Sequence, residues 1–178
     1  MKLVGIQVGK VQNHDYKGKE WRTGYMKKPV QGEVFVGELN LDGDEQHHKN
    51  FHGGIHRPVL MYSAQHYEQW REELGNDLPY GSFAENFTVT ALDEDSVCIG
   101  DIYKIGDSVQ VQVSQPRQPC NQIYQALGIR GIVKKIQANL RSGWYCRVLQ
   151  TGTVSSGMPI HLIDRSHPAW SITRTHEV

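Results

Sequence analysis

Apolar residues recur at every second position in short segments along most of the chain. This alternation is typical of strands that bury one face, because successive side chains of a strand point to opposite sides. Turn signals such as Asp-Gly, Gly-Asn and Ser-Gly separate the segments, and the chain holds 18 glycines in all. The pattern predicts a mainly β protein with a few helices, whose sheet bends back on itself as a barrel or sandwich. The expected strands are Leu3–Val8, Glu33–Val36, Val59–Tyr62, Phe87–Leu92, Val97–Ile105, Val109–Val113, Trp144–Leu149 and Ile160–Ile163.

Two segments show the period of a helix instead. The first follows an N-cap at Ser63 and ends at Gly75, a residue suited to a helix C-terminus. Its apolar stripe consists of Tyr67, Trp70 and Leu74. The second, weaker segment follows Cys120 and is interrupted by Gly128 and Gly131. A cysteine at that position would lie near a helix N-terminus, which favours the anionic thiolate.

Length and composition narrow the class of protein. A chain of 178 residues fits a single domain that can bury a hydrophobic core without disulfides or structural metals. Lysine plus arginine equals aspartate plus glutamate at 19 each, so no large basic surface for nucleic acid is expected. No stretch approaches the roughly 18 apolar residues of a membrane helix, and the first residues lack the apolar region of an export signal. We therefore expect a cytoplasmic protein that binds neither nucleic acid nor membranes.

The three cysteines, Cys98, Cys120 and Cys146, are best explained as reduced thiols. Their number is odd and their separations are long, which does not suit a disulfide framework. They also cannot supply the four thiolates of an ordinary iron–sulfur cluster. Cys98 and Cys146 lie within expected strands, where a structural role is the simpler interpretation.

Cys120 ends the segment Gln115-Pro116-Arg117-Gln118-Pro119-Cys120, in which two prolines stiffen the backbone and Arg117 contributes positive charge. A thiolate held in this way is a soft ligand that suits a thiophilic metal. The alternative is a cysteine buried as a small hydrophobic residue. Composition and spacing do not decide between the two.

The segment Phe51-His52-Gly53-Gly54-Ile55-His56-Arg57 could form an anion-binding nest, because consecutive glycines free the backbone N–H groups to face an anion and Arg57 could pair with phosphate. An ordinary tight turn is the alternative. His48, His52 and His56 recur every four residues, as zinc ligands on a helix would, but Gly53, Gly54 and Pro58 argue against a helix there.

Three further segments leave two interpretations open. Glu85-Asn86 could orient a ligand or could be a polar turn before a strand. Gly143-Trp144-Tyr145 could stack on a flat ligand or fill the core, which is the better interpretation for Trp144. The polar segment from Asp15 to Gly24 reads as a loop that either covers a site entrance or is mobile.

Taken in order, five motifs closely resemble the MOSC domain family, whose name stands for the molybdenum cofactor sulfurase C-terminal domain, and in particular its YiiM-type members. The motifs are His52-Gly53-Gly54, Phe83-Ala84-Glu85-Asn86-Phe87, Val97-Cys98-Ile99-Gly100-Asp101, Gln115-Pro116-Arg117-Gln118-Pro119-Cys120 and Gly143-Trp144-Tyr145. The resemblance spans most of the chain. It implies a MOSC-like β-barrel over residues 1–165 and a tail, residues 166–178, that resembles the start of a helical extension.

The resemblance also implies a site. Cys120 would bind the molybdenum of a molybdenum cofactor (molybdopterin), with Arg117, Asn86 and Glu85 as further catalytic residues. The cofactor-binding residues would be His52, Gly53, Gly54, Arg57, Gln115, Arg117, Gln118 and Cys120. Three positions depart from the family pattern, namely Ile55-His56 for Pro-Asp, Ala84 for glycine and Asn121 for an aromatic residue. Ala84 raises the question of whether this turn keeps a positive φ.

The implied activity is the reduction of N-hydroxylated compounds, such as hydroxylamino-purines, to amines. Because the sequence contains no flavin fingerprint and no cluster ligands, the electrons would come from a separate flavin or iron–sulfur reductase. One alternative is a carrier of sulfur or of the cofactor that uses a persulfide or thiolate at Cys120. Another is a metal-free ligand-binding barrel. The oligomeric state stays open.

Overall fold

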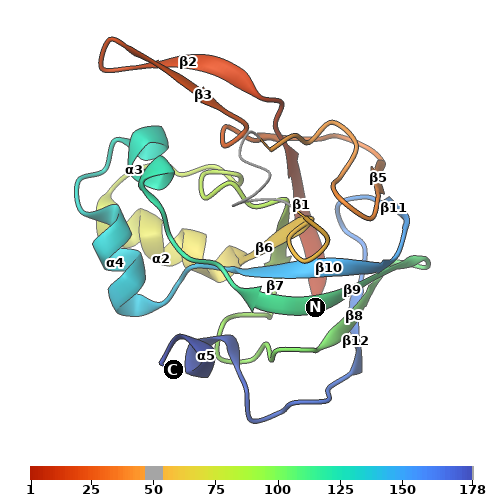
Figure 1. Ribbon diagram of the computed structural model, residues 1–178. Helices are drawn as coiled ribbons and strands as arrows, with labels where there is room; N and C mark the ends of the chain where they lie inside the picture. Colours follow the sequence, from red (N-terminus) through yellow and green to blue (C-terminus); the bar gives the residue numbers. More distant parts are fainter. Residues whose placement is uncertain (47–53, 178) are drawn as a thin grey trace.

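A computed structural model describes residues 1–46 and 54–177 of the chain (Figure 1). Within these residues, eight strands form one sheet that is antiparallel except for a parallel pair at its centre, β6 with β7. In spatial order the strands are β12 (Ile160–Asp164), β8 (Ile102–Ile105), β9 (Val109–Pro116), β10 (Trp144–Gln150), β6 (Val59–Ser63), β7 (Phe87–Thr90), β1 (Lys2–Val8) and β4 (Lys28–Pro29). The mainly β, single-domain fold is confirmed.

The expected barrel is not closed, because among the described residues no ladder joins the two edge strands β12 and β4. The outer edge of β1 is divided instead. Its end pairs with the two residues of β4. Its start is bonded to the segment around the first residue of β12 through Leu3 N–H to Met158 O (3.0 Å) and Ile160 N–H to Met1 O (3.1 Å). Strand β4 does not extend the ladder further, because it has only two residues and one of them, Pro29, has no N–H donor.

Two small sheets accompany the main one. Strand β5 (Val34–Val36) pairs with β11 (Gly152–Val154), and β2 (Gln12–Tyr16) pairs with β3 (Lys19–Thr23) as a hairpin. This hairpin replaces most of the loop expected from Asp15 to Gly24. Its two turn residues, Lys17 and Gly18, have φ values of 55° and 75°, which match a tight two-residue hairpin turn.

The helices confirm the sequence-based expectation. Helix α2 (Ala64–Leu74) follows Ser63 and ends at Gly75 in the left-handed conformation. The region after Cys120 forms α3 (Asn121–Leu127) and α4 (Ile132–Asn139), separated by Gly128 and Gly131 with positive φ. Figure 1 shows α2, α3 and α4 gathered at one side of the sheet. No helix in the described ranges is both long and apolar enough to cross a membrane.

Two hydrophobic clusters fill the domain. The larger lies along the sheet and includes Trp144 and Cys146, both fully buried. The second joins the sheet to the helices through an aromatic stack in which Tyr62 and Phe83 lie 4.8 Å apart between ring centroids. The indole N–H of Trp70 donates to Tyr62 Oη over 2.8 Å, so the core position of the α2 aromatic stripe is confirmed.

One predicted strand starts later than expected. Cys98 forms an isolated bridge to Ser171, Ile99 and Gly100 form a turn, and β8 begins only at Ile102. Asp101 causes this difference, because its buried carboxylate accepts the backbone N–H of Cys98 over 2.9 Å and closes the turn. Cys98 is therefore buried beside a turn and not within a strand.

The tail and the residue before it, Arg165, are packed onto this turn. Arg165 donates to both carboxylate oxygens of Asp101, over 2.9 and 2.7 Å. Helix α5 (Ile172–His176) follows, and Ile172 is fully buried with its N–H bonded to Val97 O. The described residues of the tail thus belong to the same packed body as the sheet.

Candidate functional site

A cavity of about 70 Å³ that opens to solvent lies beside Cys120. Its wall combines the end of the β2–β3 hairpin, the start of β6, the turn before β7, the end of β9 and the start of α3. The lining residues are Thr23, Gly24, Tyr25, Lys27, Glu45, Gln46, Arg57, Leu60, Ala84, Asn86, Arg117, Cys120, Gln122 and Tyr145.

Cys120 presents a free, half-buried thiol at the start of α3. It is the N-cap residue of this helix, as the sequence predicts, and its carbonyl accepts the N–H of Ile123 over 3.1 Å. Pro116 is the last residue of β9, and the next N–H, that of Arg117, still bonds to Gly143 O over 3.0 Å. The strand thus holds the approach to the cysteine rigidly.

The guanidinium of Arg117 is the most unusual polar group of the cavity, since the residue is only 4% exposed. Burial alone would lower the pKa of Arg117, but Tyr25, Tyr145 and Cys120 outweigh it and raise this pKa above its ordinary value. Among the described residues, Nη1 of Arg117 has no hydrogen-bond partner. A buried cationic donor without a partner is costly, so the site is suited to an anionic group that would complete it.

Two tyrosines flank this arginine. Burial raises the pKa of Tyr25 and of Tyr145, and Arg117 partly offsets the effect in both. The guanidinium of Arg57 lies 5.9 Å from the ring centroid of Tyr145. The hydroxyl of Ser114 contacts His56 O (2.6 Å) and Tyr145 O (3.0 Å), and so joins the segment carrying Arg57 to β10.

Opposite these groups, Asn86 fixes a buried ion pair. Its Oδ1 accepts the N–H of Leu60 over 3.1 Å, and its Nδ2 donates to Asp44 Oδ2 over 2.9 Å. The other oxygen of Asp44 accepts the N–H of Gly9 over 2.8 Å and the ammonium of Lys27. Asp44 and Asn86 are buried, and the side chain of Lys27 is 7% exposed.

Glu85 lies behind the cavity wall and is fully buried. Its Oε1 accepts hydrogen bonds from the hydroxyls of Tyr67 (2.6 Å) and Thr88 (2.9 Å) and from the N–H of Gly81 (2.7 Å). Burial raises the pKa of Glu85, and these hydrogen bonds oppose the rise. The neighbouring Ala84 has a φ of 62°, so the turn keeps a glycine-like conformation despite its Cβ.

The structure brings four of the predicted site residues together at the cavity, namely Arg57, Asn86, Arg117 and Cys120. The others lie elsewhere. Gln115 is on β9, Gln118 and Gly54 are exposed, and Glu85 stands behind the wall. His52 and Gly53 lie outside the described residues, as does His48 of the histidine series. In the described part of the chain no three histidine, cysteine or acidic side chains gather as metal ligands.

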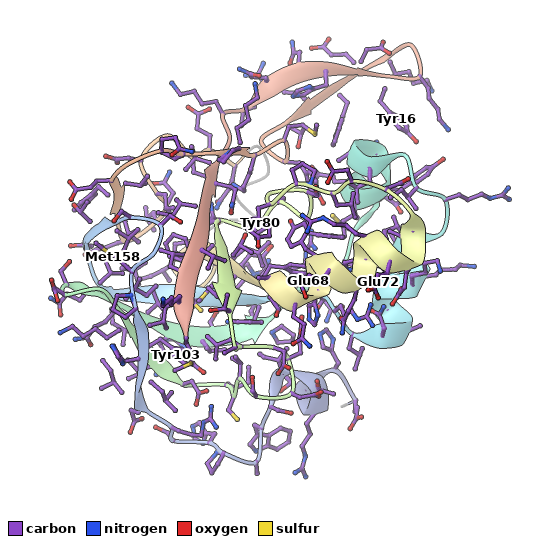
Figure 2. All side chains as sticks on the ribbon, turned by 180° about the vertical axis from the view of Figure 1, so that it is seen from behind. Tyr16, Glu68, Glu72, Tyr80, Tyr103 and Met158 are labelled. Atoms are coloured by element: carbon purple, nitrogen blue, oxygen red, sulfur yellow. The ribbon has the colours of Figure 1, made fainter. Side chains whose placement is uncertain are left out.

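Sequence reasoning missed Tyr25, Lys27 and the contact that holds the hairpin to α3. In that contact, the hydroxyl of Thr23 donates to Gln122 Oε1 over 2.7 Å. Tyr16 of the hairpin, labelled in Figure 2, also lies edge-on to Tyr124 of α3, with 6.4 Å between ring centroids. Tyr16 and Thr23 lie within the polar segment from Asp15 to Gly24, and Tyr25 and Lys27 follow it. This segment has no periodicity, so the sequence contains no local signal for these contacts.

The fold is a β-rich domain, and its cavity is lined by one half-buried free thiol, Cys120, together with the cationic side chains of Arg117 and Lys27. Residues 48–161 match the MOSC domain, and the chain belongs to the MOSC domain family. The expected family is therefore confirmed.

Known relatives cover nearly the whole chain. YflK of Bacillus subtilis is 39% identical over 170 residues, which make up 96% of this chain and 76% of YflK. A protein of Gibberella moniliformis named reductase is 34% identical, and the match covers 99% of this chain but 32% of the reductase. The crystal structure of YiiM from Geobacillus stearothermophilus superposes with a TM-score of 0.80 at 34% identity, covering 99% of this chain and 82% of that one.

Proposed function

We propose that this protein binds a molybdenum cofactor through Cys120 and reduces N-hydroxylated compounds, such as hydroxylamino-purines, to amines in the cytoplasm. Membership of the MOSC domain family and the similarity to a relative named reductase support the proposal. The observation that carries it is the half-buried thiol of Cys120 in a cavity shared with Arg117, a buried arginine whose Nη1 has no hydrogen-bond partner in the described part of the chain.

The residues of the cavity fit the proposed cofactor. A thiolate is the soft ligand that molybdenum would take, and the cations Arg117 and Arg57 suit the anionic part of the group. When bound, the cofactor supplies two-electron redox chemistry at the metal. The sequence segment His52-Gly53-Gly54, with Gln115 and Gln118, is proposed to complete its binding site.

Asn86 and Glu85 are proposed as positioning residues of this site. The amide of Asn86 uses both of its polar atoms on Leu60 and Asp44, so it shapes the wall instead of reaching into the cavity. Glu85 acts from behind the wall through Gly81 and Thr88. The two electrons of each turnover are proposed to come from a separate flavin or iron–sulfur reductase.

The test compares wild type with Cys120→Ser, both expressed in cells that make the cofactor. Molybdenum is measured by elemental analysis, and reduction of a hydroxylamino-purine is measured with a chemical electron donor. We expect near-stoichiometric molybdenum and turnover in wild type and neither in Cys120→Ser. Cys98→Ser is the matched control, because Cys98 is buried away from the cavity and should leave both unchanged.

Other outcomes separate the alternatives. Because the Cys120 thiol is accessible, it also suits a persulfide, and bound sulfur or molybdenum without turnover would favour a carrier. An absence of molybdenum from both proteins would reject the cofactor proposal. In that case, unchanged ligand binding in Cys120→Ser would favour a metal-free binding domain.

A further inference from the structure

The proposed reaction consumes protons, which some group at the cavity must deliver. Reduction of R–NH–OH by two electrons and two protons gives R–NH₂ and water. The N–O bond breaks, one proton joins the departing oxygen and the other joins the nitrogen. If a positioned acid protonates the departing oxygen, water leaves in place of the poorer leaving group hydroxide. Such general acids commonly increase the rate by 10²–10⁴-fold.

Few of the described ionisable residues that line the cavity can serve as this acid. Arg57 and Arg117 carry guanidinium groups, which do not release their protons in proteins. Burial raises the pKa of Tyr25 and of Tyr145, which makes both phenols weaker acids. Glu45 is exposed, and its Oε2 is already occupied by the N–H of Val11 over 2.9 Å.

Lys27 differs from these residues, because its ammonium group can release a proton and is held at the cavity. Its side chain lines the cavity and is 7% exposed, and its backbone N–H bonds to Tyr25 O over 2.8 Å. An ammonium carries three N–H bonds, and Asp44 is the one partner that the described residues provide for it. Asp44 is itself held by Gly9 and Asn86, so the position of the ammonium is fixed.

The environment of Lys27 also makes it a stronger acid than a surface lysine. Burial lowers the pKa of Lys27, and the two carboxyl groups that face it, those of Asp44 and Glu85, oppose part of this effect. The direction of the net change is downward, towards the neutral range in which a general acid works best.

We infer that Lys27 is the general acid of the reduction, an inference that rests on the proposed function. Its Nζ donates a proton to the departing hydroxyl oxygen of the hydroxylamine as the N–O bond breaks. Water leaves, and Lys27 becomes a neutral amine that regains a proton from solvent through the open side of the cavity. The second proton reaches the nitrogen from solvent, and the electrons come from the flavin or iron–sulfur donor.

Lys27→Arg is the decisive variant, because arginine keeps the positive charge beside Asp44 but cannot release its proton. We expect a normal molybdenum content with kcat lowered about a hundredfold or more. Wild-type activity should fall as pH rises through the Lys27 pKa, and this fall should be absent in the residual activity of Lys27→Arg. The adjacent Lys28→Arg, at an exposed position on β4, should behave as wild type.

A second measurement does not depend on turnover. In ¹⁵N NMR of wild type labelled at lysine Nζ, one signal that disappears in Lys27→Arg should titrate at lower pH than the other lysines. In Lys27→Ala, added methylamine should restore part of the lost activity, since a small amine can occupy the vacated space and donate the proton.

Several outcomes would overturn the inference. Wild-type kcat in Lys27→Arg would show that only the charge matters. Loss of molybdenum from Lys27→Arg would assign Lys27 to cofactor binding instead. If the Nζ signal titrates at the same pH as the surface lysines, Lys27 is not a stronger acid than they are, and its role as the general acid is refuted. If wild type itself takes up no molybdenum, the proposed function fails first and this role falls with it.

Discussion

The amide of Asn86 is bonded to the carboxylate of Asp44, with 2.9 Å between Nδ2 and Oδ2, although 42 residues separate them along the chain. Asn86→Ala would leave a buried carboxylate oxygen and the N–H of Leu60 without their partners. We expect the free energy of unfolding to fall by about 3 kcal/mol. Urea unfolding measures this loss. Asn76→Ala, at an exposed position, is the control, and an equal loss in both variants would contradict the assignment.

Ala84 stores backbone strain at the cavity wall, with a φ of 62°. Ala84→Gly should therefore stabilise the protein by about 0.5–1 kcal/mol, because glycine adopts positive φ without a steric penalty. Ala91, with a φ of 58° and no place in the cavity lining, should respond similarly to Ala91→Gly. Ala138→Gly, within α4, should instead destabilise by about 1 kcal/mol. Thermal unfolding of the three variants checks the ordering.

Glu85 gives stability a dependence on pH. Burial raises the pKa of Glu85 in the folded protein, so between its unfolded value of about 4.3 and the higher folded value only the folded state keeps the proton. Stability should therefore fall as pH rises through this window. In Glu85→Gln, urea unfolding at several pH values should show a smaller fall. Glu72→Gln on the exposed side of α2 (Figure 2) should retain the full fall. Parallel curves for Glu85→Gln and wild type would refute the prediction.

The three cysteines should differ in reactivity. Cys120 is half-buried, whereas Cys98 and Cys146 are 3% and 0% exposed, and burial raises the pKa of both buried thiols. A thiol reagent should label one cysteine rapidly in the folded protein and three in urea. Cys120→Ser should remove the rapid phase alone. Rapid labelling that persists in this variant would mean that another thiol is accessible.

The sequence predicted those parts of the fold whose signals are local. Helix α2 ends at Gly75 as predicted, because a glycine with positive φ acts within one turn of the helix end, whereas Ser63 precedes the helix without a side-chain capping hydrogen bond. The β2–β3 hairpin was missed because its strands carry polar residues on both faces and bury little. Its one local signal is Gly18 at the turn, which a loop would explain equally well.

The same distinction holds for the site. Cys120 and Arg117, which line the same cavity, could be predicted to lie together because they share one short, proline-stiffened segment. Lys27 and Asp44 gave no signal, because their pairing depends on where Gly9 and Asn86 lie after folding. The expectation of a closed barrel was wrong, because a period-two pattern shows which face of a strand is buried but not which strand edges pair.

The bond from Thr23 to Gln122 spans 99 residues of chain, and it joins two walls of the cavity. A partly synthesised chain has the hairpin long before α3 exists, so it cannot offer a complete pocket to any ligand. Contacts of such large sequence separation also form late in folding, after their loop-closure entropy has been overcome. Binding of any ligand in this cavity should accordingly follow the synthesis of α3 and its docking onto the hairpin, and its timing would be set by the slowest long-range docking step.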